Sequence, residues 1–133
     1  MSSNHSQYVG IIRKVITPFY NANTQKKEFK SRPGLVLTQV SATDNDLVIM
    51  PISKVQYTRN VSAEYDIKMT QVDYPNLNLS CDSYLRTHKT CVVNIADTIG
   101  CIADMKAEYP DLFLLALENY ENFSKEVVDG ALA

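Results

Sequence analysis

The chain has 133 residues, 45% of them hydrophobic, and a formal net charge of −2 at pH 7, which suits one globular domain over residues 1–133 with no room for a second. No apolar run approaches the roughly 18 residues of a membrane span, and the first residues lack a secretory signal, so we expect a soluble protein of the cytoplasm without a membrane partner. The low net charge argues against a generic nucleic-acid binder.

Charge is unevenly distributed along the chain. Residues 104–133 contain seven acidic and two basic side chains, a balance of −5, whereas residues 1–103 contain 11 basic and eight acidic side chains, a balance of +3. An anionic ligand is therefore expected on the body of the domain, away from the C-terminal segment.

The three cysteines, Cys81, Cys91 and Cys101, form an odd set without a C-x-x-C pair. This pattern indicates neither a disulfide framework nor a zinc site. We expect reduced, mostly buried thiols and no metal or cofactor.

The N-terminal third predicts a strand and a basic loop. Residues 8–15 (YVGIIRKV) are rich in β-branched side chains and predict the first strand. Residues 17–33 predict a polar loop that ends at Pro33-Gly34, where the missing proline N–H marks the start of the next strand.

The middle of the chain predicts a hairpin and further strands. Residues 34–41 (GLVLTQVS) and 46–53 (DLVIMPIS) are short apolar strands joined by the turn-forming ATDND. Residues 54–80 predict an irregular strand plus loop. Residues 81–95 (CDSYLRTHKTCVVNI) predict one strand, and TIGCIA predicts a last strand that runs up to Asp104.

The C-terminal segment predicts an amphipathic helix. Pro110 and Asp111 suit its first turn, and Gly130 suits a position just past its end. The apolar residues recur at three- and four-residue steps: Leu112, Phe113, Leu114, Leu115, Leu117, Tyr120, Phe123 and Val127. Five or six strands followed by one long helix predict a mainly β fold with α (α+β), a small, strongly bent antiparallel barrel capped by a helix.

Two polar residues mark the ends of neighbouring predicted strands. Arg32 precedes one strand of the hairpin and Ser53 ends the other. In an antiparallel hairpin the start of one strand lies beside the end of the next, so the guanidinium and the hydroxyl should be near neighbours. This pairing suits the binding of one phosphate.

Several motifs together resemble the MazF/PemK toxins of bacterial type II toxin–antitoxin systems. They are Val9-Gly10-Ile11, SRPGLVL, VIMPIS and CDSYLRTHK, and they occur in the family's order and spacing. The resemblance extends over most of the chain. The resemblance implies a small SH3-like antiparallel β-barrel of the CcdB/MazF/Kid type. It also implies a homodimeric, metal-independent and sequence-selective endoribonuclease that cleaves single-stranded RNA, inhibits growth and is neutralised by a cognate antitoxin.

The same resemblance assigns site residues. The motif arginine falls on Arg32, the Ser/Thr two residues after the proline falls on Ser53, and the acid of the PemK branch falls on Asp82. Ser80 stands where that branch has a basic residue, and Gly10 is not followed by the usual acid. The third catalytic role therefore stays open.

The implied chemistry is attack of a ribose 2′-OH on the adjacent phosphorus, which leaves a 2′,3′-cyclic phosphate and a 5′-OH. Arg32 would stabilise the developing phosphorane charge, and Ser53 would hydrogen-bond a phosphate oxygen or Arg32. Asp82 is the candidate general base, and Arg86 or His88 would add a positive charge or a general acid. A regular strand would put these three on one face together with Tyr84.

RNA-binding proteins commonly stack bases on aromatic rings and contact phosphates with basic side chains. Tyr65 and Tyr74 could line the groove, although core packing explains them equally well. The RNA-binding residues expected from these rules are Lys26, Lys27, Lys30, Lys54, Tyr57, Arg59 and Tyr84.

Duller readings and rival functions stay open. Arg32 could be a solvated loop cation, Ser53 a turn residue and His88 a surface histidine. One rival function is a gyrase-poisoning toxin of the same fold, although the ending KEVVDGALA lacks the tryptophan associated with that activity. The other is a catalytically inactive binding domain that keeps the barrel.

Overall fold

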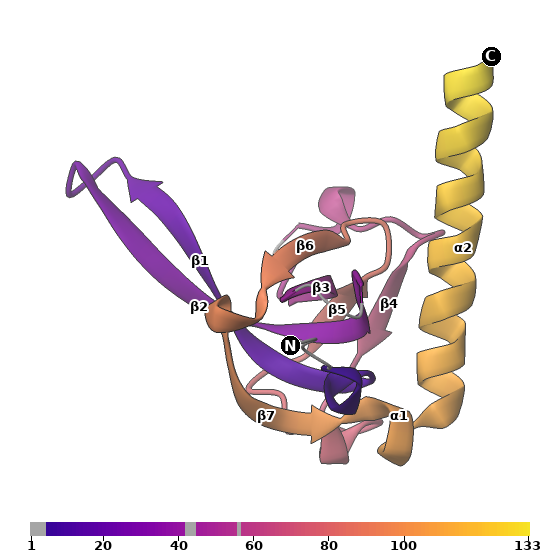
Figure 1. The fold of residues 1–133 in the computed structure, drawn as a ribbon, viewed down its shortest axis with the longest axis horizontal. Coiled ribbons are helices and arrows are strands. Elements are labelled where there is room, and N and C mark those ends of the chain that lie inside the picture. The colour runs from indigo at the N-terminus through magenta and orange to yellow at the C-terminus, as the bar shows by residue number, and fades with distance from the viewer. Residues whose placement is uncertain (1–4, 42–44, 56) are drawn as a thin grey trace.

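The computed structural model describes residues 5–41, 45–55 and 57–133. These residues form an α+β fold, in which a strongly curled antiparallel sheet packs against a long C-terminal helix (Figure 1). The sheet has seven strands among the described residues, in the order β4-β5-β3-β2-β1-β7, with β6 also paired to β3. The predicted fold class is confirmed at this level, with one or two strands more than expected.

The first two strands form one long hairpin. β1 (Ile11–Asn21) and β2 (Lys26–Gln39) pair without interruption from Ile12↔Leu35 to Asn21↔Lys26. The predicted polar loop over residues 17–33 is therefore wrong, and so is the predicted strand start at residue 8, because β1 begins only after Gly10, whose φ is 84°. Aromatic and β-branched residues such as Phe19 and Phe29 alternate along this segment and favour strand despite its lysines.

Residues 16–31 of this hairpin project from the body as a two-stranded arm, seen at the upper left of Figure 1. Pairing of β1 with β7 ends at Val15, and pairing of β2 with β3 ends at Gly34. Within the described residues, the arm therefore has two free edges and no covering layer.

The third strand joins the two halves of the sheet. β3 (Asp46–Ser53) pairs antiparallel with β2, so the predicted hairpin is confirmed, while residues 42–44 of its predicted turn lie outside the described residues. On its other side β3 pairs first with β6 (Cys91–Asn94) and then with β5 (Ser83–Arg86).

The single strand predicted over residues 81–95 is therefore two strands. Ile52 pairs with Leu85 and Ile49 with Cys91, so three steps along β3 face six steps along the opposite segment. The three extra residues form a turn in which Lys89 N–H donates to the Arg86 carbonyl at 3.0 Å. Thr87 in this turn is fully buried, because its hydroxyl donates to the Tyr65 carbonyl at 2.6 Å.

The remaining strands close the two edges of the sheet. Residues 54–80 are irregular as predicted, with one short strand, β4 (Asp66–Met69), which pairs with β5. β7 (Thr98–Asp104) is the predicted last strand and pairs with β1.

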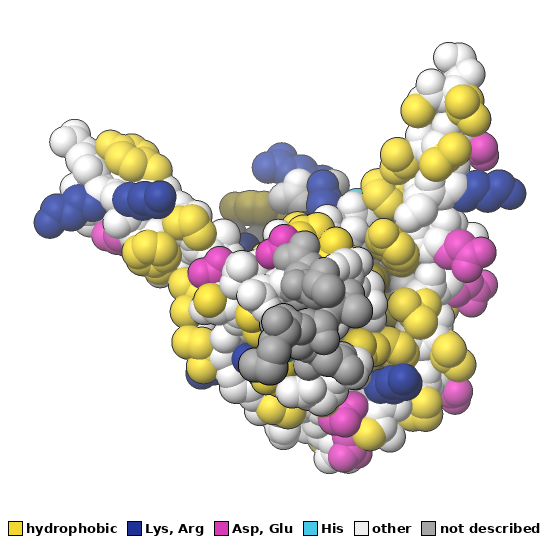
Figure 2. All heavy atoms as spheres, in the orientation of Figure 1, with side chains coloured by type: hydrophobic (Ala, Val, Ile, Leu, Met, Phe, Trp, Pro, Cys, Tyr) yellow, Lys and Arg dark blue, Asp and Glu magenta, His cyan; other side chains and the backbone are white. Residues whose placement is uncertain are grey.

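The C-terminal helix covers one side of the sheet with its first half. α1 (Met105–Glu108) leads into α2 (Pro110–Leu132), with Pro110 in the first turn as predicted. Leu112, Phe113 and Ala116 are buried in the main core. The second half of α2 extends beyond the body (Figure 1), and acidic side chains gather along its outer side (Figure 2).

Some details of the predicted helix are wrong. Gly130 lies inside the helix, which continues to Leu132, because Gly130 does not adopt the positive φ of a helix-ending glycine. Leu114, Leu115 and Val127 are exposed, because they face away from the sheet or lie beyond it. No helix within the described residues is long and apolar enough to cross a membrane.

The cysteine prediction is partly wrong. All three thiols are free, as expected, but Cys91 and Cys101 are exposed and Cys81 is half-buried. Cys91 and Cys101 lie on β6 and β7, which are edge strands with one open face.

Gly34 sits where three strands pack closest. A Cβ atom at this position would lie 2.5 Å from Ile49 Cγ2 on β3 and 2.9 Å from Val15 Cγ2 on β1. These contacts belong to β-branched side chains of the second core cluster, which cannot rotate away freely. The absence of a side chain at Gly34 is therefore required for Val15 of β1 and Ile49 of β3 to pack over β2.

We expect Gly34→Ala to lower the free energy of unfolding by about 1–3 kcal/mol, because the added methyl group overpacks the core. Gly130→Ala is the matched control. A Cβ atom added at Gly130 would meet nothing within 4 Å outside the helix's own backbone, and a helical alanine is favoured over glycine, so the stability of this variant should stay the same or rise. Urea denaturation of the three proteins measures both effects. Equal stability of the two variants would contradict the packing described here.

Candidate functional site

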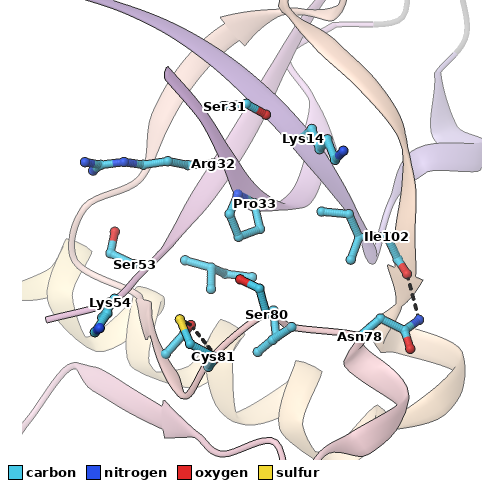
Figure 3. Close-up of a pocket in the computed structure, with 13 residues that line it drawn as sticks. Lys14, Ser31, Arg32, Pro33, Ser53, Lys54, Asn78, Ser80, Cys81 and Ile102 are labelled. Atoms are coloured by element: carbon cyan, nitrogen blue, oxygen red, sulfur yellow. Dashed lines mark hydrogen bonds between the residues drawn. The ribbon is translucent and has the colours of Figure 1, made fainter. Parts of the chain in front are cut away.

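A pocket of about 480 Å³ lies where β2 leaves the body to enter the arm. Its lining comes from β1, β2, β3, β7 and the segment before β5 (Figure 3). The lining residues are Lys14, Ser31, Arg32, Pro33, Ile52, Ser53, Lys54, Asn78, Leu79, Ser80, Cys81, Ser83 and Ile102.

Strand register brings Arg32 and Ser53 to this pocket. The last pair between β2 and β3 is Gly34↔Pro51; Arg32 and Ser53 lie two residues beyond it on their strands, and both line the pocket. In Figure 3 Arg32, Ser53 and Lys54 lie along one side of the pocket, and Lys14, Asn78 and Ile102 lie on the other. The two residues that the sequence placed at neighbouring strand ends thus share one pocket.

The lining of the pocket favours an anion. Lys14, Arg32 and Lys54 provide three positive charges, and Ser31, Ser53, Ser80 and Ser83 provide hydroxyl groups. None of the described residues that line the pocket is an aspartate or a glutamate. Arginine, lysine and hydroxyl donors without a competing carboxylate are the groups that bind phosphate.

Two lining residues are held by local hydrogen bonds. Ser83 is buried, and its hydroxyl donates to the Cys81 carbonyl at 3.0 Å. The Asn78 side chain donates to the Ile102 carbonyl at 2.9 Å, which ties the loop before β5 to β7 (Figure 3). These bonds fix the floor and one wall of the pocket.

A row of polar side chains crosses the sheet beside the pocket. Tyr84 on β5 pairs with Ser53 on one side and with Lys68 on the other. Because paired residues share a face, Ser53, Tyr84 and Lys68 follow one another across β3, β5 and β4. Tyr84, an expected RNA-binding residue, is thereby a neighbour of Ser53.

Asp82, the expected general base, is not among the residues that line the pocket. Its neighbours Cys81 and Ser83 do line the pocket. Asp82 Oδ1 accepts a hydrogen bond from Gln71 N–H at 2.8 Å, and the side chain is exposed. Its contact in the structure is to the backbone of another loop.

Arg86 and His88 belong to a second charged cluster, around Asp66. The Asp66 carboxylate is fully buried; it accepts from Arg86 Nε at 3.0 Å and from Ser62 N–H at 2.8 Å. A second guanidinium nitrogen of Arg86 donates to the Asn60 carbonyl at 2.9 Å. Removing one partner from a buried pair of this kind typically costs about 3–5 kcal/mol. Arg86 is therefore committed to holding β4, β5 and the preceding loop together.

His88 packs between this cluster and α2. Its ring lies 5.8 Å from that of Tyr65 and 6.1 Å from that of Phe123, measured between centroids. Its Nδ1 is 3.6 Å from Asp66 Oδ1, too long for a hydrogen bond. Burial lowers the pKa of His88; Asp66 opposes this shift, and Arg86 adds to it.

Tyr65 is the other polar group at this interface. Its pKa is raised, chiefly by a hydrogen-bonding interaction with Glu126 on α2 and further by burial. Its hydroxyl oxygen nevertheless has no acceptor within full hydrogen-bond distance among the described residues. Tyr65 is buried, and Tyr74 packs edge-on against Tyr109 at 5.1 Å, so neither lines a groove as the sequence had suggested.

The other expected RNA-binding residues are dispersed. Lys54 lines the pocket, and Arg59 stacks on the exposed Tyr57 ring at 5.1 Å in the segment that follows. Lys26, Lys27 and Lys30 lie on the arm, where Lys30 Nζ sits 4.3 Å from the centre of the Phe19 ring.

Sequence reasoning missed five polar residues of the pocket: Lys14, Ser31, Asn78, Ser80 and Ser83. Lys14 and Ser31 carried a usable signal, because a long β1–β2 hairpin would have put both on the face of Pro33. Asn78 carried no such signal, since its place depends on an irregular loop. No group of three or more His, Cys, Asp or Glu side chains that could hold a metal ion occurs in residues 5–41, 45–55 and 57–133.

Comparison with known proteins assigns no family. No protein-family model matches the chain, and no curated protein matches it either. The likeness to MazF/PemK toxins therefore rests on the motifs of the sequence alone.

The lowered pKa of His88 predicts a pH dependence of stability. The folded state favours the neutral imidazole, so its contribution is complete above the unfolded pKa of about 6.5 and is lost as pH falls through that value toward the lower folded pKa. We expect the unfolding free energy to fall between about pH 7.5 and 5.5, and His88→Gln to reduce this slope. His5→Gln, at the other histidine of the chain, is the control and should keep it. Urea titrations across this range measure the slope, and a wild-type slope in His88→Gln would refute the assignment.

Proposed function

We propose that the chain is a metal-independent endoribonuclease that cleaves single-stranded RNA at the Arg32 pocket. The observation that carries this proposal is the convergence of Arg32 and Ser53 with two lysines, Lys14 and Lys54, in a pocket whose described lining contains no carboxylate. Such a lining suits a phosphodiester and the extra charge that develops on it during transfer. The motif resemblance supplies the reaction class.

The chemistry starts with one backbone phosphate held between the Arg32 guanidinium and the Ser53 hydroxyl. The 2′-oxygen forms a bond to phosphorus while its proton passes to a solvent water, because no carboxylate lines the described pocket, and the bond from phosphorus to the 5′-oxygen breaks. Arg32 stabilises the charge on the non-bridging oxygens, because a guanidinium keeps its proton near neutral pH. Lys14 or Lys54 is placed to donate a proton to the departing 5′-oxygen, a role first considered for Arg86 or His88.

The biological setting follows from the same resemblance. The curled sheet, in which β3 is shared between two sets of strands, supports an SH3-like barrel of the CcdB/MazF/Kid type. We propose a cytoplasmic, homodimeric toxin of a type II toxin–antitoxin system, inhibited by an antitoxin segment that occupies the same cationic pocket. A carboxylate-rich segment would match the charge of Lys14, Arg32 and Lys54.

A second candidate function is RNA binding without cleavage. It is favoured by the position of Asp82, which contacts the Gln71 backbone outside the pocket. It is also favoured by the ion pair that holds Arg86 at Asp66. On this account the pocket still binds a phosphate, but no carboxylate base meets the 2′-OH.

The decisive experiment is incubation with mixed-sequence single-stranded RNA in EDTA, with end-group analysis of the products. Wild type should give 5′-OH and 2′,3′-cyclic phosphate ends. Arg32→Ala should lower the cleavage rate by about 10²–10³-fold, the usual effect of removing one charge-stabilising donor.

Lys125→Ala is the control, because Lys125 is exposed on α2 outside the pocket, and it should cleave within a few fold of wild type. RNA that binds to Arg32 but stays intact would favour the second candidate. Equal cleavage by wild type and Arg32→Ala would place the active site elsewhere.

A further inference from the structure

The arm has two chemically different faces. Paired residues of an antiparallel ribbon share a face, and successive pairs alternate between faces. One face carries Val15/Arg32, Thr17/Lys30, Phe19/Glu28 and Asn21/Lys26, and the other, here named the Tyr20 face, carries Ile16/Ser31, Pro18/Phe29 and Tyr20/Lys27.

The first of these faces is occupied by its own contacts. Lys30 covers the Phe19 ring at 4.3 Å. Glu28 accepts hydrogen bonds from the Asn21 side chain at 3.1 Å and from the Thr24 hydroxyl at 3.0 Å. Its charged and aromatic groups thus already have partners.

The Tyr20 face is open. Tyr20 is 67% exposed and Phe29 is 68% exposed. Within the described residues, Tyr20, Lys27 and Phe29 make no side-chain hydrogen bond, ion pair or ring contact. Figure 2 shows hydrophobic and basic side chains side by side on the arm. Two free aromatic rings beside a free cation form a surface that water solvates poorly.

This face continues directly from the pocket. Lys14 and Pro33 are the next pair along the same face of the ribbon, and both line the pocket together with Ser31. At about 3.3 Å per residue, the path from Ser31 past Phe29 to Lys27 is about 13 Å long. A ligand that extends from the pocket along this face therefore meets first Lys14 and Ser31, then the Phe29 ring, and then Tyr20 with Lys27.

We propose that the Tyr20 face is a binding track for the bases of single-stranded RNA that flank the phosphate in the pocket. Phe29 and Tyr20 each stack one base, and Lys27 contacts a phosphate beyond them. Rings at regular steps beside cations are the arrangement by which proteins hold single strands with little sequence preference. The inference rests on the proposed function only in taking RNA as the ligand.

A second copy of the chain is the competing occupant, because α2 offers acidic and exposed apolar side chains such as Val127 and Val128. The continuity of the Tyr20 face with a cationic pocket favours RNA. A protein partner would have no need of the Lys14 cation and the Ser31 hydroxyl, which lie on the same face of the ribbon at its pocket end.

The test is binding of a single-stranded RNA of about ten nucleotides whose riboses are 2′-O-methylated, so that it binds without being cleaved. Tyr20→Ala and Phe29→Ala should each weaken binding about 5- to 100-fold through lost stacking, and Tyr20→Phe should bind like wild type. Phe19→Ala, on the opposite face, is the aromatic control and should keep wild-type affinity. A methylated RNA of about two nucleotides, which reaches only the pocket, should not distinguish these variants.

The lysines give a second, charge-based test. Lys27→Ala should reduce the slope of log affinity against log salt by about 0.7, the value for one phosphate contact on a single strand. Lys125→Ala, at an exposed lysine of α2 away from the arm, should leave the slope unchanged. Equal slopes in the two variants would overturn the assignment of Lys27.

The outcomes separate this inference from the nuclease proposal. If RNA binding depends on Tyr20 and Phe29 but unmodified RNA is not cleaved, the binding track is supported and the nuclease proposal is rejected. Cleavage by a wild type whose Tyr20→Ala and Phe29→Ala variants bind normally keeps the nuclease and overturns the track. A dimer that dissociates in these variants while RNA affinity is unchanged assigns the face to a second copy and also overturns it. Failure of the wild type to bind the longer RNA overturns it as well.

Discussion

The site depends on the close packing of side chains from β1 and β3 over Gly34 of β2. Only a residue without a side chain leaves room there for Val15 and Ile49, which pack from the two flanking strands. That packing fixes the register between β2 and β3, and two residues beyond its last pair lie Arg32 and Ser53, which both line the pocket. Pro33, directly before Gly34, lines the pocket. The same dipeptide therefore allows the packing of Val15 and Ile49 and forms part of the pocket lining.

Charge in this molecule is divided between two centres with different environments. In the Asp66 cluster, Asp66, Arg86 and His88 are largely removed from water, and each charge has a partner or is suppressed by burial. In the pocket, Lys14, Arg32 and Lys54 have no carboxylate partner in the described lining and stay accessible. Unsatisfied positive charge at an accessible concave surface marks a binding site, whereas paired buried charge serves the fold.

Much of this arrangement could be predicted from the sequence. The β2–β3 hairpin, β7 and α2 follow from local alternation, turn residues and helical periodicity. The placement of Arg32 with Ser53 follows from hairpin geometry alone. The arm was missed because the lysines and other polar residues of 17–33 predicted a loop. The alternating aromatic residues, which favour strand, were the weaker signal there. The break between β5 and β6 was also hidden, since it depends on the burial of Thr87 against the Tyr65 carbonyl. Asp82, Arg86 and His88 looked like one face of a strand, but Arg86 and His88 gather around Asp66 and Asp82 instead contacts the Gln71 backbone.

The central claim, that the pocket beside Gly34 binds an RNA phosphate, is tested most directly by nuclear magnetic resonance. Isotope-labelled protein would be titrated with a 2′-O-methylated single-stranded RNA, and the change in each backbone amide signal recorded. The account predicts that the largest changes fall on Ser31, Arg32, Ser53 and Lys54. Changes that gather around Asp66 and His88, with the signals of Arg32 and Ser53 unmoved, would contradict it.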